Sequence, residues 1–318
     1  MTETSFTIRA YHGCEEAALL ELWNAAMTHD RITPVIFRTK VLLDLNFNPD
    51  GLLVAESAGR LVGFLLSLSR QVPQFLDGLQ PDQAWITAFG VHPAFRGHGI
   101  GTALFDHTLT RLARMGKKEV AISPYTPNYF VPGIDIAAYP ETIVFLEKHG
   151  WQITSEPISM RVETTGFQVP EDIKAREAAL AADGYAVRPV TPADLPELMT
   201  FIQRCFSWDW VRHAQDYLLE LFGAGSDQVC FLIATHNGRI VGYCQQRRER
   251  FGPFGVDPSL RSRGLGRVLL THCLAEMLAK GFHAAWFLWT GRDAARLYSL
   301  AGFKEVRQFA VMKKTLAS

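Results

Sequence analysis

Two stretches of the chain repeat one pattern of glycine, proline and arginine. Residues 90–101 read GVHPAFRGHGIG, and residues 255–266 read GVDPSLRSRGLG. Each copy follows an apolar stretch and opens a run in which apolar residues have helical spacing. A glycine-rich turn at the start of a helix offers free backbone N–H donors, no Cβ in the way and the positive end of the helix dipole. The duplication therefore predicts a phosphate-binding turn in each half, whether still used or only ancestral.

The repetition extends well beyond the two turns. Residues 59–64 read GRLVGF, and residues 238–243 read GRIVGY. Further along, Gly150-Trp151 recurs as Gly302-Phe303. A repeat of this length indicates two copies of one domain, because solenoids repeat units of only a few tens of residues.

The spacing between the two copies shrinks in two steps along the chain. This places two insertions in the first half, around 71–83 and around 124–140. A chain of 318 residues is long enough for two domains of ordinary size, each with its own core. We therefore expect a first domain at 1–163, a linker at 164–184 and a second domain at 185–318.

Hydrophobic periodicity predicts the same order of strands and helices in both halves. A further helix is expected after Pro170, within the linker. The class is therefore α/β, with a mixed sheet flanked by helices in each domain. The expected strands are 6–10, 52–56, 61–68, 84–91, 119–123, 151–154 and 158–163, then 185–189, 230–234, 240–245, 254–256, 284–289 and 306–312. The expected helices are 15–27, 99–115 and 141–149, then 194–205, 264–280 and 294–300.

The composition argues against several classes of partner. Lysine plus arginine balance aspartate plus glutamate at 32 each, so the chain lacks the excess of positive charge that favours nucleic acid or anionic membranes. The five cysteines are scattered without Cys-x-x-Cys or metal-ligand spacing, which is typical of reduced thiols. No apolar run spans a bilayer and the N-terminus has no signal pattern. We expect a cytoplasmic protein without metal, nucleic acid or membrane partners, as a monomer or homodimer.

With a strand, Arg-x-x-Gly-x-Gly and a helix in this order twice, the chain resembles the GCN5-related N-acetyltransferases, specifically a tandem member. The resemblance covers nearly all of the chain outside the linker. It implies two acyl-CoA N-acyltransferase-like domains, each a twisted mixed sheet, and acetyl-CoA as the cosubstrate. The alternative of a dinucleotide fingerprint fails, because Leu104 and Leu269 stand where that fingerprint needs a small residue.

In the family, the turn cradles the pyrophosphate of acetyl-CoA, and the preceding strand offers backbone groups to the pantetheine arm. Carried over by position, the resemblance assigns nine cofactor-binding residues to each half. Those of the first half are Phe89, Gly90, Val91, Arg96, Gly97, His98, Gly99, Ile100 and Gly101. Those of the second half are Phe254, Gly255, Val256, Arg261, Ser262, Arg263, Gly264, Leu265 and Gly266.

Family members often protonate the leaving thiolate with a tyrosine four residues before the glycine of the Gly-aromatic pair. That position is Tyr298 in the second half and Leu146 in the first, so the resemblance assigns the catalytic acid to Tyr298. Gly291 stands where many relatives have asparagine, seven residues before the tyrosine, which departs from the family pattern. The alternative interpretation of Tyr298 is a core tyrosine whose hydroxyl has a hydrogen-bond partner.

Other aromatic and acidic residues are candidates near the acceptor. Tyr125 and Tyr129, in the second insertion, are alternative acids for the first half. The segment 206–210 places Asp209 between two tryptophans, which suits an ammonium group. The simpler interpretation of that segment is two tryptophans packed at the interface between the two halves. Residues 27–33, with a histidine and an aspartate, occupy the matching position in the first half.

The resemblance implies an acetyl-CoA-dependent N-acyltransferase that acetylates a primary amine, with a small molecule as the leading acceptor. Two alternatives stay open. One is a non-catalytic regulatory or interaction protein that binds CoA. The other is a protein N-acetyltransferase, whose acceptor cleft should be open and acidic.

Overall fold

The computed structural model describes residues 5–225 and 227–316. The chain divides into two compact units that do not coincide with its two halves. The first unit contains the chain up to Pro157 together with the residues from Gln308 onward, and the second contains Ile158–Arg307.

The first unit is built on a mixed sheet with the strand order β1-β2-β3-β4-β5-β14. Its neighbours are antiparallel except for β4 and β5, which run parallel. The parallel pairing ends at Ile86, so residues 87–91 of β4 extend beyond their partner strand. The strands are β1 (Thr7–Ala10), β2 (Leu52–Ser57), β3 (Arg60–Leu68), β4 (Gln83–Val91), β5 (Glu119–Ile122) and β14 (Lys304–Thr315), with β6 (Ile134–Asp135) and β7 (Gln152–Ser155) also paired to β14.

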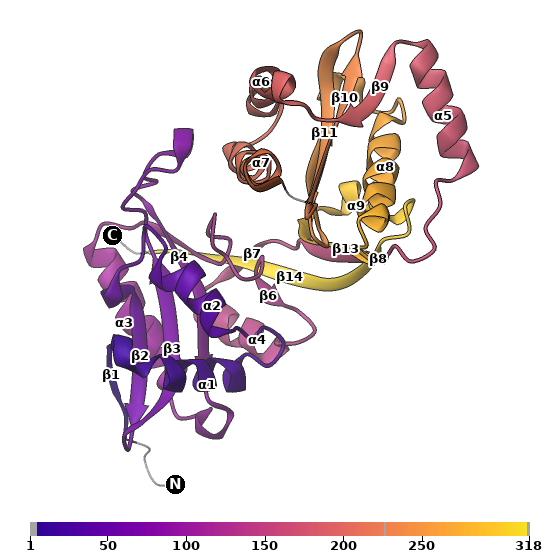
Figure 1. The fold of residues 1–318 in the computed structure, drawn as a ribbon. Coiled ribbons are helices and arrows are strands. Elements are labelled where there is room, and N and C mark those ends of the chain that lie inside the picture. The colour runs from indigo at the N-terminus through magenta and orange to yellow at the C-terminus, as the bar shows by residue number, and fades with distance from the viewer. Residues whose placement is uncertain (1–4, 226, 317–318) are drawn as a thin grey trace. The chain divides into compact units, whose positions relative to one another are not determined.

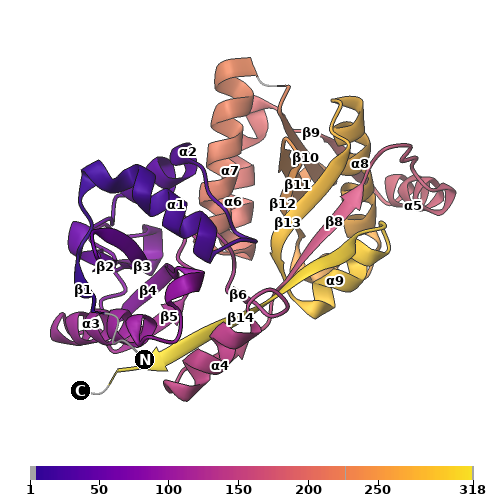
Figure 2. The same ribbon diagram turned by 90° about the horizontal axis from the view of Figure 1, so that it is seen from below.

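Helices cover both faces of this sheet, as Figure 2 shows for α1 and α2 on one side and α3 on the other. On the α1 face, Trp23 is fully buried and stacks on Phe64 at 4.7 Å between ring centroids. On the α3 face, Leu104 and Phe105 join Leu65 in a second apolar cluster. The helices are α1 (Glu16–Ala26), α2 (Pro34–Phe37), α3 (Ile100–Arg114) and α4 (Pro140–Lys148).

The second unit repeats this plan with the strand order β9-β10-β11-β12-β13-β8. Figure 1 shows α6 and α7 on one side of the sheet and α5 and α8 on the other. Leu265, Leu269, Cys273 and Met277 of α8 are buried, as their four-residue spacing predicts. The elements are β8 (Ile158–Glu163), β9 (Tyr185–Pro189), β10 (Val229–His236), β11 (Arg239–Arg247), β12 (Arg250–Val256) and β13 (Ala284–Thr290), with α5 (Glu171–Ala182), α6 (Leu195–Cys205), α7 (Trp208–Glu220), α8 (Leu265–Ala279) and α9 (Arg292–Ser299).

The structure differs from the sequence-based domains at the two strands that were expected to close each half. β8 pairs with β13 in the second unit, and β14 pairs with β5 in the first. The buried side chains agree with this pairing, because Met160 of β8 lies in the core of the second unit and Met312 of β14 in the core of the first. Periodicity identifies a strand but not the sheet edge that it joins, and the two edges belong to copies of one domain.

The expected linker 164–184 is also part of the second unit. Its helix α5 packs on α8, where Asp172 pairs with Arg267 at 3.0 Å and Glu177 lies 2.9 Å from His272. The expected boundaries 1–163, 164–184 and 185–318 therefore differ from the compact units that the structure forms.

Candidate functional site

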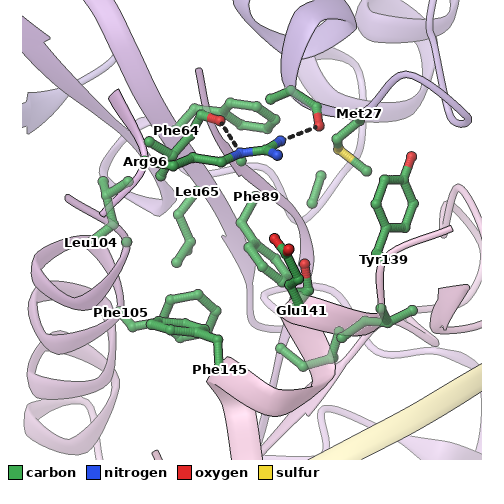
Figure 3. A pocket seen from close by; sticks show the side chains of 18 of the residues that line it. Met27, Phe64, Leu65, Phe89, Arg96, Leu104, Phe105, Tyr139, Glu141 and Phe145 are labelled. Carbon is green, nitrogen blue, oxygen red and sulfur yellow. Dashed lines mark hydrogen bonds between the residues drawn. The ribbon is translucent and has the colours of Figure 1, made fainter. Parts of the chain in front are cut away.

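A cavity of about 850 Å³ lies beside the first glycine-rich turn, within the first unit. Its walls come from β4, the turn, α3, the start of α4 and the end of α1, and Figure 3 shows several of their side chains. Eight of the nine cofactor-binding residues expected in the first half line it, and only His98 does not. The ring of His98 instead lies 2.9 Å from the carbonyl oxygen of Arg96.

The backbone of this turn has the conformation that the glycines predict. Gly97 and Gly99 have φ values of +79° and +80°, a region that residues with a Cβ rarely adopt. Gly99 caps α3 without any side-chain hydrogen bond, so the first N–H groups of the helix remain available. A Cβ built on either glycine has no protein atom within 4 Å. The space beside the turn is therefore open to a ligand.

Arg96 ties this turn to the two elements beside it. Its Nε donates to the carbonyl of Val91 and its Nη2 to the carbonyl of Ala26, each at 3.3 Å. Figure 3 shows the guanidinium held between these oxygens. The arginine therefore sits at the cavity wall with its positive charge beside the glycine-rich turn.

The other polar groups of the cavity come from β4, α4 and the loop after α1. Thr87 is buried, and its Oγ1 has no partner within the described part of the chain. Tyr139 precedes α4, and its hydroxyl accepts a hydrogen bond from the backbone N–H of His29 at 3.1 Å. Asp30 and Glu141 also line the cavity. Arg96 supplies the positive charge of this wall, so carboxylates outnumber cations there.

Tyr139 was missed by the sequence reasoning, although a signal for it exists. Leu146 occupies the usual position of the acid and is fully buried in the core. Seven residues before it, where many relatives have asparagine, stands Tyr139. The signal for Tyr139 is therefore its spacing from Leu146, which places a tyrosine hydroxyl just before α4.

The second turn has nearly the same backbone as the first. Ser262 and Gly264 have φ values of +69° and +84°, and Gly264 caps α8 as Gly99 caps α3. The predicted residues fall on matching elements. Phe254, Gly255 and Val256 lie on β12, Arg261, Ser262 and Arg263 form the turn, and Gly264, Leu265 and Gly266 open α8.

The surroundings of the second turn are more crowded. A Cβ on Gly264 would lie 3.0 Å from Nε of Arg176, a residue of α5. The strands before the two turns are alike, because Phe206 packs against Gly255 as Ala26 and Phe64 pack against Gly90. The crowding of the second unit is therefore at its glycine cap.

Tyr298 lies on α9 within a group of phenylalanine rings. Its ring centroid is 4.4 Å from that of Phe287, and the rings of Phe251, Phe254 and Phe303 also surround it. Burial raises the pKa of its hydroxyl above the ordinary tyrosine value. The side chain is half-buried, and no hydrogen bond joins its hydroxyl to a residue that the structure describes. The ring packing is that of a core tyrosine, but the hydroxyl lacks the partner that this alternative expects.

The other candidate tyrosines lie away from the cavity. Tyr125 is fully buried, where its hydroxyl donates to Asp44 and accepts from Asn46, each at 2.8 Å. This burial argues against Tyr125 as the acid of the first half. Tyr129 is absent from the cavity wall, and its carbonyl accepts a hydrogen bond from Lys40 at 2.9 Å.

The segment 206–210 is the end of α6 and the start of helix α7, which was not predicted. Trp210 stacks on Phe206 at 4.6 Å between centroids. Asp209 pairs with Arg212 at 2.8 Å, so its carboxylate already has a cationic partner. Trp210 is therefore a packing residue, but the stacking partner seen here belongs to the second unit itself and not to an interface between the halves.

A known protein family matches the two segments that contain this arrangement of strand, turn and helix. The model of the acetyltransferase (GNAT) family matches residues 17–129 and again residues 195–303. The chain belongs to this family. Its two matches make it a tandem acetyltransferase, with one family domain in each half of the sequence.

Curated acetyltransferases resemble this one at modest identity. A mycothiol acetyltransferase from Sanguibacter keddieii is 28% identical over 242 residues, covering 67% of this chain and 69% of the relative. An L-2,4-diaminobutyric acid acetyltransferase from Nocardia farcinica is 31% identical over 127 residues, covering 39% of this chain and 58% of the relative. Among solved structures, a GCN5-related glucosamine N-acetyltransferase region of a fungal β-N-acetylglucosaminidase has a TM-score of 0.80 at 19% identity, covering 99% of this chain and 38% of that one.

In residues 5–225 and 227–316, no three histidine, cysteine, aspartate or glutamate side chains gather in a way that could hold a metal ion. In the same ranges, no helix combines the length and the apolar character needed to cross a membrane.

Proposed function

We propose that this acetyltransferase moves an acetyl group from acetyl-CoA to a primary amine of a small molecule, in the cavity of the first unit. The observation that carries the proposal is the open cavity of about 850 Å³ around a glycine-capped helix start. Pockets for small molecules and cofactors commonly measure roughly 300–1,000 Å³. Family membership supports the reaction type, because acetyl transfer to nitrogen is the family's activity.

The residues around the cavity fit the acyl donor at two places. The N–H groups at the start of α3 and the nearby guanidinium of Arg96 suit a pyrophosphate. Residues 87–91 of β4 extend past the end of their parallel pairing with β5, so their backbone groups on that side suit the amides of pantetheine. The donor itself supplies the acetyl group as a thioester.

The chemistry needs an amine that has lost a proton, donors for the tetrahedral oxyanion and a donor for the departing thiolate. Thr87 offers a buried hydroxyl that is unpaired among the described residues, and Tyr139 offers a hydroxyl at the start of α4. We propose Tyr139 as the donor to the thiolate, because it lines the cavity. Tyr298, at the usual family position, is the second candidate and would place the chemistry in the other half.

We propose a small, positively charged amine as the acceptor. Asp30 and Glu141 line the same cavity, and their carboxylates favour an ammonium group over an anion. The names of the two curated relatives refer to acetylation of small molecules, which supports this class over a protein acceptor.

We also propose a cytoplasmic location and a monomer or homodimer without nucleic acid or membrane partners. The five cysteines are all unpaired, which fits a reducing compartment. The balanced charge of the chain supports the absence of polyanionic partners.

The proposal is tested by incubating the protein with acetyl-CoA and a panel of small amines while free thiol is detected. We expect thiol release with at least one small amine, and its strong reduction in Arg96→Ala but not in the matched variant Arg261→Ala. Release only with lysine-containing peptides would support a protein acetyltransferase instead. Tight CoA binding without release with any amine or peptide would support the non-catalytic alternative.

A further inference from the structure

A layer of buried and half-buried polar side chains lies between α7 and β11 in the second unit. Asp209, His213 and Tyr217 follow one another at four-residue spacing, so they share one face of α7. Tyr243 and Gln245 alternate along β11 and share one face of that strand. The helix packs on this strand. Polar residues thus meet where a core normally has apolar ones.

Several polar atoms in this layer have no hydrogen-bond partner among the described residues. Gln245 is fully buried, and neither its amide nitrogen nor its amide oxygen is paired. The hydroxyls of Tyr217 and Tyr243 are likewise buried and unpaired. Each such group lowers the stability of the fold when it is left without a partner. Native proteins keep such groups for a reason, such as an ordered water or a bound ligand.

The fold itself does not require polar residues here. In the first unit, the matching strand β3 carries Phe64 and Leu66 at the positions of Tyr243 and Gln245, and both are fully buried. The second copy of the domain has therefore acquired polar groups at positions that the first copy fills with apolar side chains.

Unbalanced positive charge lies beside these groups. Arg247 of β11 and Arg250 of β12 stand directly opposite each other in an antiparallel pair, an arrangement that is unfavourable for like charges. Arg247 has a carboxylate partner, Glu220, at 3.4 Å, and its guanidinium lies 4.7 Å from the ring centroid of Tyr217. Arg250 is half-buried over the ring of Trp286 at 5.7 Å and has no carboxylate partner in the described ranges.

His213 adds a further donor to the layer. Nε2 of His213 lies 3.1 Å from Nη2 of Arg212 and 3.6 Å from Oδ2 of Asp209. Because a guanidinium can only donate, the shorter contact favours the neutral imidazole with its proton on Nδ1. Burial, with Arg212 next in effect, holds the pKa of His213 well below its usual range.

We propose that this layer binds the carboxylate of a small molecule, held by Arg250 and by the donors of Gln245, Tyr217 and His213. A guanidinium matches the planar, two-oxygen geometry of a carboxylate, and the ligand charge would relieve the opposition of Arg247 and Arg250. Arg247 is exposed, so a ligand reaches the layer from the side of the two arginines. The ligand site is separate from the cavity of the first unit.

The experiment measures the unfolding temperature of the full chain while acetate, lactate or succinate is titrated at constant ionic strength set with chloride. We expect a saturable stabilisation by at least one carboxylate and none by chloride. Arg250→Gln should weaken that affinity by about tenfold or more, because a hydrogen bond to a charged group is lost. Arg239→Gln, on the same strand, is the matched control and should respond like the wild type. Arg96→Ala should also keep the response, and this result would distinguish the carboxylate site from the cavity of the first unit.

Gln245→Leu gives a second and sharper readout. It introduces the residue that the first unit has at this position, so the ligand-free protein should unfold at a higher temperature while the carboxylate response is lost. A retained response in both Arg250→Gln and Gln245→Leu would overturn the proposal, as would the absence of any saturable carboxylate effect. A saturable effect of inorganic phosphate alone would overturn the assignment to carboxylates.

Discussion

Arg176 lies against Gly264, with Nε 3.0 Å from the position that a Cβ on that glycine would occupy. The matching glycine of the first turn, Gly99, has no protein atom within 4 Å of the same position. The two turns therefore differ less in their own backbone than in what α5 places beside one of them. The acyl donor is assigned to the first unit because an open cavity lies beside its turn.

The hydroxyl of Tyr139 is the first group to test for chemistry. Tyr139→Phe keeps the ring and should lower the rate of acetyl transfer by roughly 10²–10⁴-fold, the range for loss of a general acid. Affinity for CoA should change little. Steady-state rates for Tyr139→Phe and Tyr298→Phe, measured side by side, decide between the two units. A full rate in Tyr139→Phe with a large loss in Tyr298→Phe would move the chemistry to the second unit.

The glycine that caps α3 should be needed for binding more than for folding. Gly99→Ala places a Cβ in open space but keeps φ near +80°, which costs about 1–2 kcal/mol of stability for a residue with a Cβ. The domain should stay folded by circular dichroism while its affinity for CoA falls. Loss of the native spectrum would indicate that the glycine serves the fold instead.

Tyr125 should matter for stability and not for catalysis. Its hydroxyl bridges Asp44 and Asn46 in a buried network, so Tyr125→Phe leaves the side-chain amide nitrogen of Asn46 without this partner and removes one of the two donors to Oδ1 of Asp44. We expect a loss of about 1–3 kcal/mol in the free energy of unfolding. The rate per folded molecule should remain that of the wild type, and denaturant titration together with the thiol assay checks both values. A large rate loss in a stably folded variant would restore Tyr125 as a candidate acid.

His213 should make stability depend on pH in a defined window. Its pKa is lowered to about 4 in the folded chain by burial, while the unfolded chain has the ordinary value of roughly 6.5. Between these values the unfolded chain binds a proton that the folded chain does not, so stability falls as the pH falls. Across this pH window, the free energy of unfolding should fall by about 1–3 kcal/mol less in His213→Gln than in the wild type. Denaturant unfolding at several pH values checks this, and parallel curves for the two proteins would contradict it.

The sequence predicts most elements and the first turn, because both rest on local patterns. The helix after Gly99 and the hairpins follow from periodicity and turn residues that act within a few positions. The exchange of β8 and β14 between the units cannot be predicted in this way, since the apolar residues Met160 and Met312 suit either sheet. The position of Arg176 beside Gly264 could not be predicted from the sequence either, because a helix with few buried residues gives no sign of where it packs.

The central claim is that acetyl-CoA binds at the first turn. Calorimetric titration of acetyl-CoA into the wild type, Arg96→Ala and Arg261→Ala tests it most directly. The account predicts one tight site per chain, weakened by about tenfold or more in Arg96→Ala and unchanged in Arg261→Ala. Tight binding that survives Arg96→Ala and disappears in Arg261→Ala would contradict it.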